Sequence, residues 1–176
     1  MRFVIYSTML VCFVVGEALA QDPFGNVTNE PRPSEFIHWD SESFVGFKSE
    51  LEDQLRQGPG ILGTPFAVLN ALPQADHRHH NVQIIHRAGY TQPEIHETKW
   101  DIYVILDGSG TALLGGERVG WVEGLPREEQ RPELSGATEF HITKGDIVHV
   151  PARSWHQLTV PDGQSITYVL INVYED

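Results

Sequence analysis

The chain has 176 residues, a formal net charge of −12 and a single cysteine, Cys12. An excess of acidic residues this large, without a basic stripe, argues against nucleic acid and anionic membrane surfaces as partners. One cysteine excludes a disulfide within the chain, so the hydrophobic core has to stabilise the fold alone, which a chain of this size can do.

The amino-terminal segment has the order of a secretory signal peptide. Arg2 precedes an apolar run that reaches Val15, and Ala18-Leu19-Ala20 supplies the small residues of a cleavage site. The run is too short for a membrane anchor. We therefore expect residues 1–20 to be removed and the mature protein to be extracellular, or periplasmic if the host is Gram-negative.

Residues 21–40 are rich in proline and glycine and predict an irregular leader. It contains a glycosylation sequon at Asn26, which is usable only in a eukaryotic host. Residues 41–60 predict an amphipathic helix and a turn, with Ser43 as N-cap and the helix ending at Gly58-Pro59-Gly60. Its apolar stripe would lie on a sheet or on a partner subunit. The stripe consists of Phe44, Phe47, Leu51 and Leu55.

Residues 61–176 alternate short extended runs with turn signals, as in an all-β sandwich or small barrel. The expected strands are 66–72, 81–87, 100–106, 111–114, 138–142, 147–150, 157–160 and 166–173. Gly108-Ser109-Gly110 is one of the expected turns. Residues 117–136, rich in proline, glycine and glutamate, predict a long loop.

Two separated blocks of the chain contain metal-ligand side chains. Glu94 and His96 alternate along an extended segment and share a face, and Asp101 begins an apolar run. His156 lies in a second block that starts at Gly145. Carboxylate and imidazole donors together suit a divalent transition metal. Clustered carboxylates also need a positive charge nearby, and Lys99 would provide it if no metal were bound.

These blocks resemble the two motifs of the cupin superfamily. Glu94-x-His96-x4-Asp101-x6-Gly108 is similar to the first motif, with glutamate in place of the first histidine and aspartate in place of the glutamate. Gly145-x5-Pro151-x-Arg153-x2-His156 is similar to the second, with Arg153 in place of a turn glycine and Val160 in place of the asparagine. The resemblance covers roughly residues 80–174.

The resemblance implies a fold and a metal. The fold is a cupin-type double-stranded β-helix, a jelly-roll barrel, preceded by the one amphipathic helix. Glu94, His96, Asp101 and His156 would hold one divalent metal ion. The mixed donor set favours Mn or Fe, with Cu, Ni and Zn as alternatives.

Other polar residues are weaker candidates for a functional role. Arg153 could bind a substrate carboxylate, and Tyr103 could contact the substrate, so both are candidate catalytic residues. His86 fits a structural role better than a role beside the metal. The histidines at 77, 79 and 80 fit a solvated loop, and His141 and His149 fit structural positions.

Two functions remain open. The resemblance implies a metal-dependent enzyme, either an oxidoreductase of the dioxygenase or oxalate-converting kind, or an isomerase or lyase. Its substrate would be a small acid, a carbonyl compound or a sugar. The alternative is a non-catalytic cupin that binds an extracellular ligand. In both cases the apolar helix stripe and the exposed edges of an open sandwich favour a homodimer.

Overall fold

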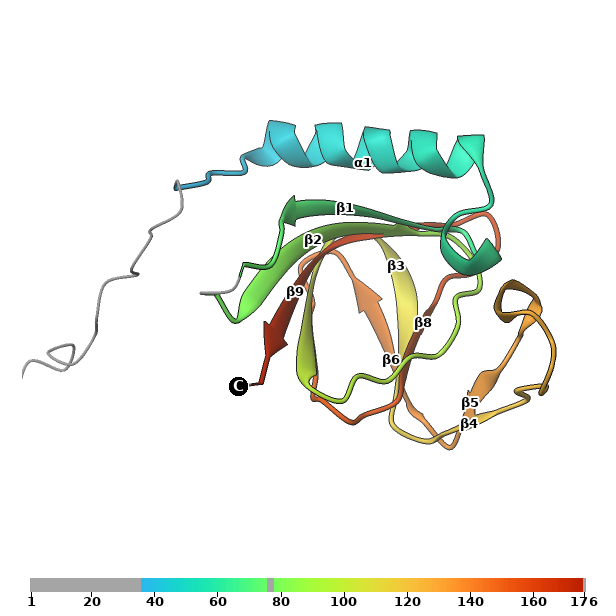
Figure 1. Cartoon of the computed structure of the whole chain (residues 1–176). Coiled ribbons are helices and arrows are strands. Elements are labelled where there is room, and N and C mark those ends of the chain that lie inside the picture. Colours follow the sequence, from blue (N-terminus) through green and yellow to red (C-terminus); the bar gives the residue numbers. More distant parts are fainter. Residues whose placement is uncertain (1–35, 76–77, 176) are drawn as a thin grey trace, which may run out of the picture. The chain divides into compact units, whose positions relative to one another are not determined.

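The computed structural model describes residues 36–75 and 78–175, which belong to one compact unit (Figure 1). The predicted signal peptide, most of the leader, the Asn26 sequon and His77 lie outside the described residues. No helix among the described residues has the length and apolar character needed to cross a membrane.

Helix α1 spans Ser41–Gln57 and confirms the predicted helix. Its N-cap is Asp40, so the prediction of Ser43 is wrong: Oδ1 of Asp40 accepts hydrogen bonds from the backbone N and the Oγ of Ser43, both at 2.8 Å. An aspartate carboxylate caps a helix as well as a serine does, and here it lies three residues earlier. The helix ends before Gly58, as expected.

The apolar stripe of α1 packs on the sheet of its own chain. Leu51 is fully buried, and Phe44, Phe47 and Leu55 pack with it against Ala67 and Ile84 of the first two strands. Burial of one leucine side chain contributes about 2 kcal/mol to folding. The helix stripe therefore gives no support to a homodimer, because the chain itself covers it (Figure 1).

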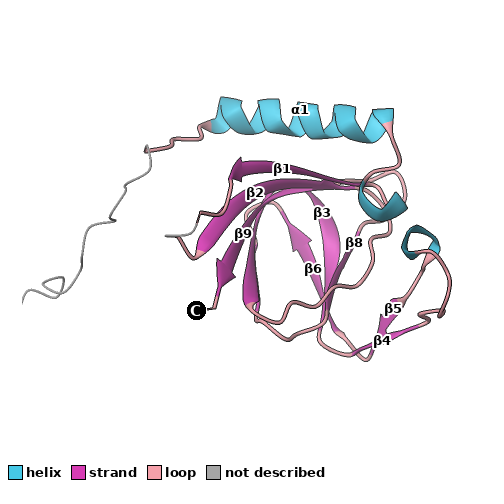
Figure 2. Cartoon of the chain, in the orientation of Figure 1, coloured by secondary structure: helices cyan, strands magenta, loops and turns pink. Residues whose placement is uncertain are grey.

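The rest of the described chain is an antiparallel β-barrel with two short 3-10 helices (Figure 2). The principal strands are β1 Phe66–Leu72, β2 His80–Arg87, β3 Lys99–Leu114, β6 Thr138–Thr143, β7 Ile147–Val150, β8 His156–Thr159 and β9 Ile166–Tyr174. They are paired in the order β1-β2-β9-β3, with β6 and β7 along one side of β3 and β8 beside its second half. This pairing gives the predicted all-β jelly-roll barrel.

Strand β3 is continuous where the sequence predicted two strands and a turn. Its first half pairs with β7 and β9, and its second half pairs with β6 and β8. Gly108 permits the bend between the halves: its φ is +77°, and a Cβ there would collide with the carbonyl oxygen of Ser165. Gly108 thus bends the strand without ending it.

Residues 117–136 are more regular than the expected loop. They form a small hairpin, β4 Glu117–Val119 with β5 Glu133–Ser135, and a 3-10 helix, η2 Arg127–Glu129. Gln130 is fully buried and holds the connection, since its Oε1 accepts from the backbone N of Val122 at 2.9 Å. Helix η2 contacts the other 3-10 helix, η1 Ile61–Gly63.

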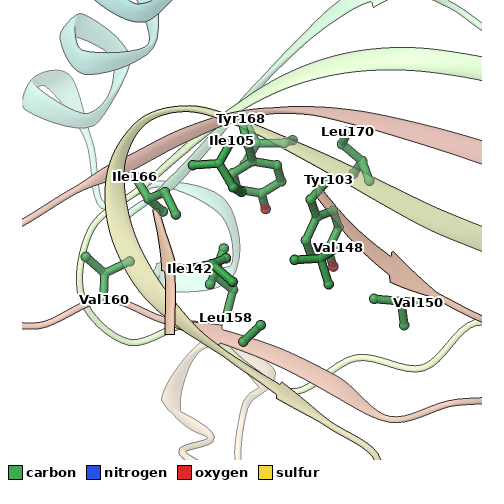
Figure 3. Packing of buried hydrophobic residues seen from close by; sticks show 12 residues of the cluster. Tyr103, Ile105, Ile142, Val148, Val150, Leu158, Val160, Ile166, Tyr168 and Leu170 are labelled. Atoms are coloured by element: carbon green, nitrogen blue, oxygen red, sulfur yellow. The ribbon is translucent and has the colours of Figure 1, made fainter. Parts of the chain in front are cut away.

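The barrel interior is filled by aliphatic side chains and two tyrosines (Figure 3). Tyr103 and Tyr168 lie side by side, with ring centroids 4.9 Å apart. Inward positions recur every second residue along each strand, so Asp101, Tyr103 and Ile105 of β3 share the interior face. The fold therefore places Asp101 on the same face as the apolar core.

Candidate metal centre

The four predicted ligands come from three segments of the barrel. Glu94 and His96 lie in the extended segment between β2 and β3, Asp101 lies on β3, and His156 begins β8. Reciprocal backbone hydrogen bonds between Glu94 and His156, at 2.9 and 3.0 Å, hold the first segment beside β8. The two blocks of sequence thus meet in space as predicted.

The donor atoms of these side chains converge. Oδ2 of Asp101 lies 3.3 Å from Nε2 of His96 and 3.4 Å from Nε2 of His156. Oε2 of Glu94 lies 3.8 Å from Nε2 of His96, and donors of Glu94, His96 and His156 all lie within 4.8 Å of one another. Ligand atoms about 2.1 Å from one transition ion are separated by about 3.0 to 4.2 Å. The group whose donors all lie close enough to share an ion consists of Glu94, His96 and His156. Asp101 lies outside this group but is close to both histidines.

Two imidazole nitrogens in this cluster lack hydrogen-bond partners. Nε2 of His96 and Nε2 of His156 are both buried, and neither makes a hydrogen bond, although Oδ2 of Asp101 lies 3.3 and 3.4 Å away. Nδ1 of His156 lies 3.0 Å from the carbonyl oxygen of Ser154, which can only accept, so Nδ1 carries a proton and Nε2 is the nitrogen left to bind a metal. Buried polar atoms without partners are costly, and a metal ion would satisfy both nitrogens.

Outer partners orient both carboxylates. Nδ2 of Asn172 donates to Oδ1 of Asp101 at 2.7 Å, and Nη2 of Arg87 donates to Oε1 of Glu94 at 3.0 Å. Each carboxylate therefore keeps its second oxygen for the cluster. Partners of this kind fix ligand orientation in metalloproteins, and they strengthen the fit of this donor set to a metal.

Arg87 contacts the cluster, and the sequence patterns did not predict this. Its side chain is 3% exposed, lies 4.1 Å from the ring centroid of Phe66, and donates to Oγ1 of Thr91 at 2.8 Å. Arginine is rarely buried unless paired. The available signal was its place two residues after Ile85, which puts Arg87 on the same inward face of β2.

The electrostatics of the cluster favour ionised carboxylates. Burial raises the pKa of Asp101, but the imidazoles of His156 and His96 outweigh it and hold this pKa below its usual range. Burial likewise raises the pKa of Glu94, and the guanidinium of Arg87, helped by His156, outweighs it and lowers the pKa. Both carboxylates are in the form that binds a cation.

Arg153 is not brought to the cluster. Its guanidinium is exposed and makes two hydrogen bonds to the carboxylate of Glu175, at 2.7 and 3.0 Å, and another to the carbonyl of Glu97. The backbone of Arg153 has a φ of +61°, which favours glycine, the residue of the cupin motif at this position. Arg153 is therefore one of two non-glycine residues with positive φ among the described residues.

The other predicted residues lie elsewhere in the barrel. Tyr103 is buried in the core one inward step from Asp101, and no hydrogen bond joins it to the four donors. His86 is buried, and its Nδ1 lies 2.8 Å from Oγ1 of Thr167. Its strand partner is Ala67, which packs beneath α1. This position fits the structural role predicted for His86. His141 and His149 are exposed on β6 and β7.

One small cavity lies beside the cluster. A cavity of about 40 Å³ is lined by Arg87, Thr91 and Glu94 among others. Two cavities of about 310 and 380 Å³ are lined by residues of other parts of the barrel and by none of the four donors. Among the four donors, His96 and Glu94 are partly exposed to solvent, at 21% and 36%.

Comparison with known proteins yields structures but no sequence family. No family model and no curated protein matches the chain. Similar solved structures include the Cnp3 cupin domain of Schizosaccharomyces pombe, with 8% identity and a TM-score of 0.46, over 62% of this chain and 65% of that one. This chain thus spans slightly less than two thirds of that domain.

Two further structures are similar. A predicted oxalate decarboxylase of Thermotoga maritima has 13% identity and a TM-score of 0.46, over 62% of this chain and 80% of that one. A cupin-2 domain of Rhodospirillum rubrum has 16% identity and a TM-score of 0.46, over 64% of this chain and 62% of that one.

Proposed function

We propose that the chain binds one divalent transition metal through Glu94, His96, Asp101 and His156 and is an exported, metal-dependent oxidoreductase. Its substrate is a small acid, a carbonyl compound or a sugar. The observation that carries the proposal is the pair of buried, unpartnered Nε2 atoms of His96 and His156 on either side of an ionised aspartate. Mn or Fe suits the mixed set of nitrogen and oxygen donors better than Cu.

A bound metal would supply Lewis acidity and, if it is Mn or Fe, redox chemistry. The residues of the chain prepare the site for it. Asn172 and Arg87 each hold one oxygen of a ligand carboxylate, and Ser154 fixes the tautomer of His156. Below the site, Tyr103 and its apolar neighbours exclude water from one side. The open side is the one on which His96 and Glu94 reach solvent.

Metal content tests this proposal. Protein purified without chelator should carry close to one transition ion per chain, and His96→Ala or His156→Ala should remove it. His141→Ala is the matched control, because His141 is exposed on β6. Wild-type protein without metal, and without uptake of added Mn²⁺ or Fe²⁺, would contradict the proposal. Oxygen uptake with small acids and sugars then tests turnover.

A non-catalytic ligand-binding role is the second candidate. The observation that favours it is the filled barrel, since the cavity beside Glu94 measures only about 40 Å³. A binding protein would retain metal and a ligand without product formation. An isomerase or lyase would instead form product without consuming oxygen.

Export and a homodimer complete the proposal. Export is supported by the signal-peptide pattern of residues 1–20, and the intact mass of secreted protein tests it.

A dimer is supported by the outer edge of β6 and β7, where Phe140 is 49% and Ile147 is 69% exposed. Light scattering at micromolar concentration measures the oligomeric state.

A further inference from the structure

The inner face of β3 carries a lysine next to the metal centre. Lys99 lies two residues before Asp101, and its Nζ is 3.8 Å from Oδ1 of Asp101. This is the one ion pair recorded for Lys99 within the described residues. We infer that Lys99 recognises a carboxylate group of a small anionic substrate at the metal centre. The inference rests on the proposed metal-binding function and narrows its substrate class to small organic acids.

Lys99 is not required to hold Asp101 in place. Oδ1 of Asp101 already accepts a hydrogen bond of 2.7 Å from Asn172. The lysine ammonium, at 3.8 Å, lies beyond hydrogen-bond distance from the same oxygen. Its three N–H donors therefore remain available to a ligand.

The charges at the site also point to an anion. Arg87 lies beside Glu94, and Lys99 lies beside Asp101. The two cations therefore balance the charges of the two carboxylates. With neutral imidazoles the site is formally neutral before metal binds, and a divalent ion makes it positive. The chain as a whole carries −12. Its field repels anions except where local positive charge reverses it.

Lys99 is partly exposed to solvent. Its side chain is 23% exposed, similar to the 21% of His96, whereas Asp101 and His156 are each 3% exposed. A small molecule bound beside Asp101 can therefore be met by the ammonium of Lys99. Arg153, the residue predicted for this role, is instead paired with Glu175.

Binding of a dicarboxylate tests the inference. Protein reconstituted with Co²⁺ is titrated with malonate and, separately, with its uncharged analogue malonamide, and the visible absorption of the metal is followed. Wild type should bind malonate more tightly than malonamide. Lys99→Met should weaken malonate binding roughly tenfold, as expected for one lost hydrogen bond to a charged group, and Lys99→Arg should retain most of it. Malonamide binding and Co²⁺ stoichiometry should not change.

Lys144→Met is the matched control. It removes the same charge from an exposed turn between β6 and β7, and it should leave malonate affinity unchanged. Equal malonate affinity in wild type and Lys99→Met would overturn the inference, as would an equal loss in Lys144→Met or loss of Co²⁺ from Lys99→Met. Failure of the wild-type protein to bind Co²⁺ would overturn the proposed metal site itself.

Discussion

Two regions of the barrel interior are built by the same strands and differ in what fills them. The apolar region consists of Ile105, Ala112, Ile142, Val148, Leu158, Ile166 and Tyr168. The polar region consists of Arg87, Glu94, Asp101, His156 and Asn172. Side chains of the apolar region contribute to stability by their burial alone. Buried polar groups are costly unless each has a partner, so the polar region is arranged for binding and contributes less to folding.

The largest effect on stability should come from the apolar region. Ile105→Ala removes a side chain that is 2% exposed, and we expect it to lower the free energy of unfolding by about 3 kcal/mol. Metal affinity should stay within about twofold of wild type, because Ile105 contacts no ligand. Urea unfolding and metal titration measure the two quantities. A large loss of affinity would mean that the two regions are coupled.

Metal removal should act on the polar region alone. An ion present at a hundred times its dissociation constant stabilises the native state by about 2.7 kcal/mol. Chelation should therefore lower the melting temperature of wild type and leave His96→Ala unchanged. Scanning calorimetry with and without chelator makes the comparison. An equal shift in both proteins would contradict binding at this site.

Arg87 tests the role of the outer partners. Arg87→Lys keeps the buried charge but loses the paired N–H groups that contact Thr91 and Glu94. We expect metal affinity to fall about 10- to 100-fold, as for other residues that orient ligands. Co²⁺ spectra report the change in ligand geometry. Unaltered spectra and affinity in a folded variant would limit Arg87 to a structural role.

Acid should destabilise the metal-free protein partly through Asp101. Its pKa is lowered in the folded state, so the unfolded state takes up a proton first as pH falls below about 4. The contribution of Asp101 to stability is complete at neutral pH, and it is lost progressively as the pH falls below about 4. Asp101→Asn should show a shallower loss of stability there. The measurement is urea unfolding between pH 6 and pH 3.

The smallest effect should come from Arg153. Its pairing with Glu175 is solvent-exposed, and such pairs contribute about 0.2 to 1 kcal/mol. Arg153→Ala should destabilise slightly, while Arg153→Gly should recover part of the loss because φ is +61°. Thermal melts of the two variants give the difference. If Arg153→Ala were the more stable of the two, strain at this position would be absent.

Strand positions and the candidate donor residues could be predicted because they depend on local patterns. Extended runs bounded by turn signals predicted strands at 66–72 and 147–150, which the structure has with the same bounds. Motif spacing indicated Glu94, His96, Asp101 and His156 as candidate ligands. Contacts between distant residues outside the two motifs could not be predicted. Arg87 reaches Glu94 only in the folded barrel, and Arg153 is turned towards Glu175, 22 residues away. The continuity of β3 also depends on a distant contact, between Gly108 and Ser165.

The continuous strand β3 has a consequence for how the protein unfolds. It is paired with β6, β7, β8 and β9, so neither half of the barrel can separate without breaking hydrogen bonds to this one strand. Segments that open only with the whole molecule have the slowest amide hydrogen exchange. Amides in the middle of β3 should therefore exchange at the rate of global unfolding, whereas β1, an edge strand paired only with β2 in the sheet, should exchange through local opening.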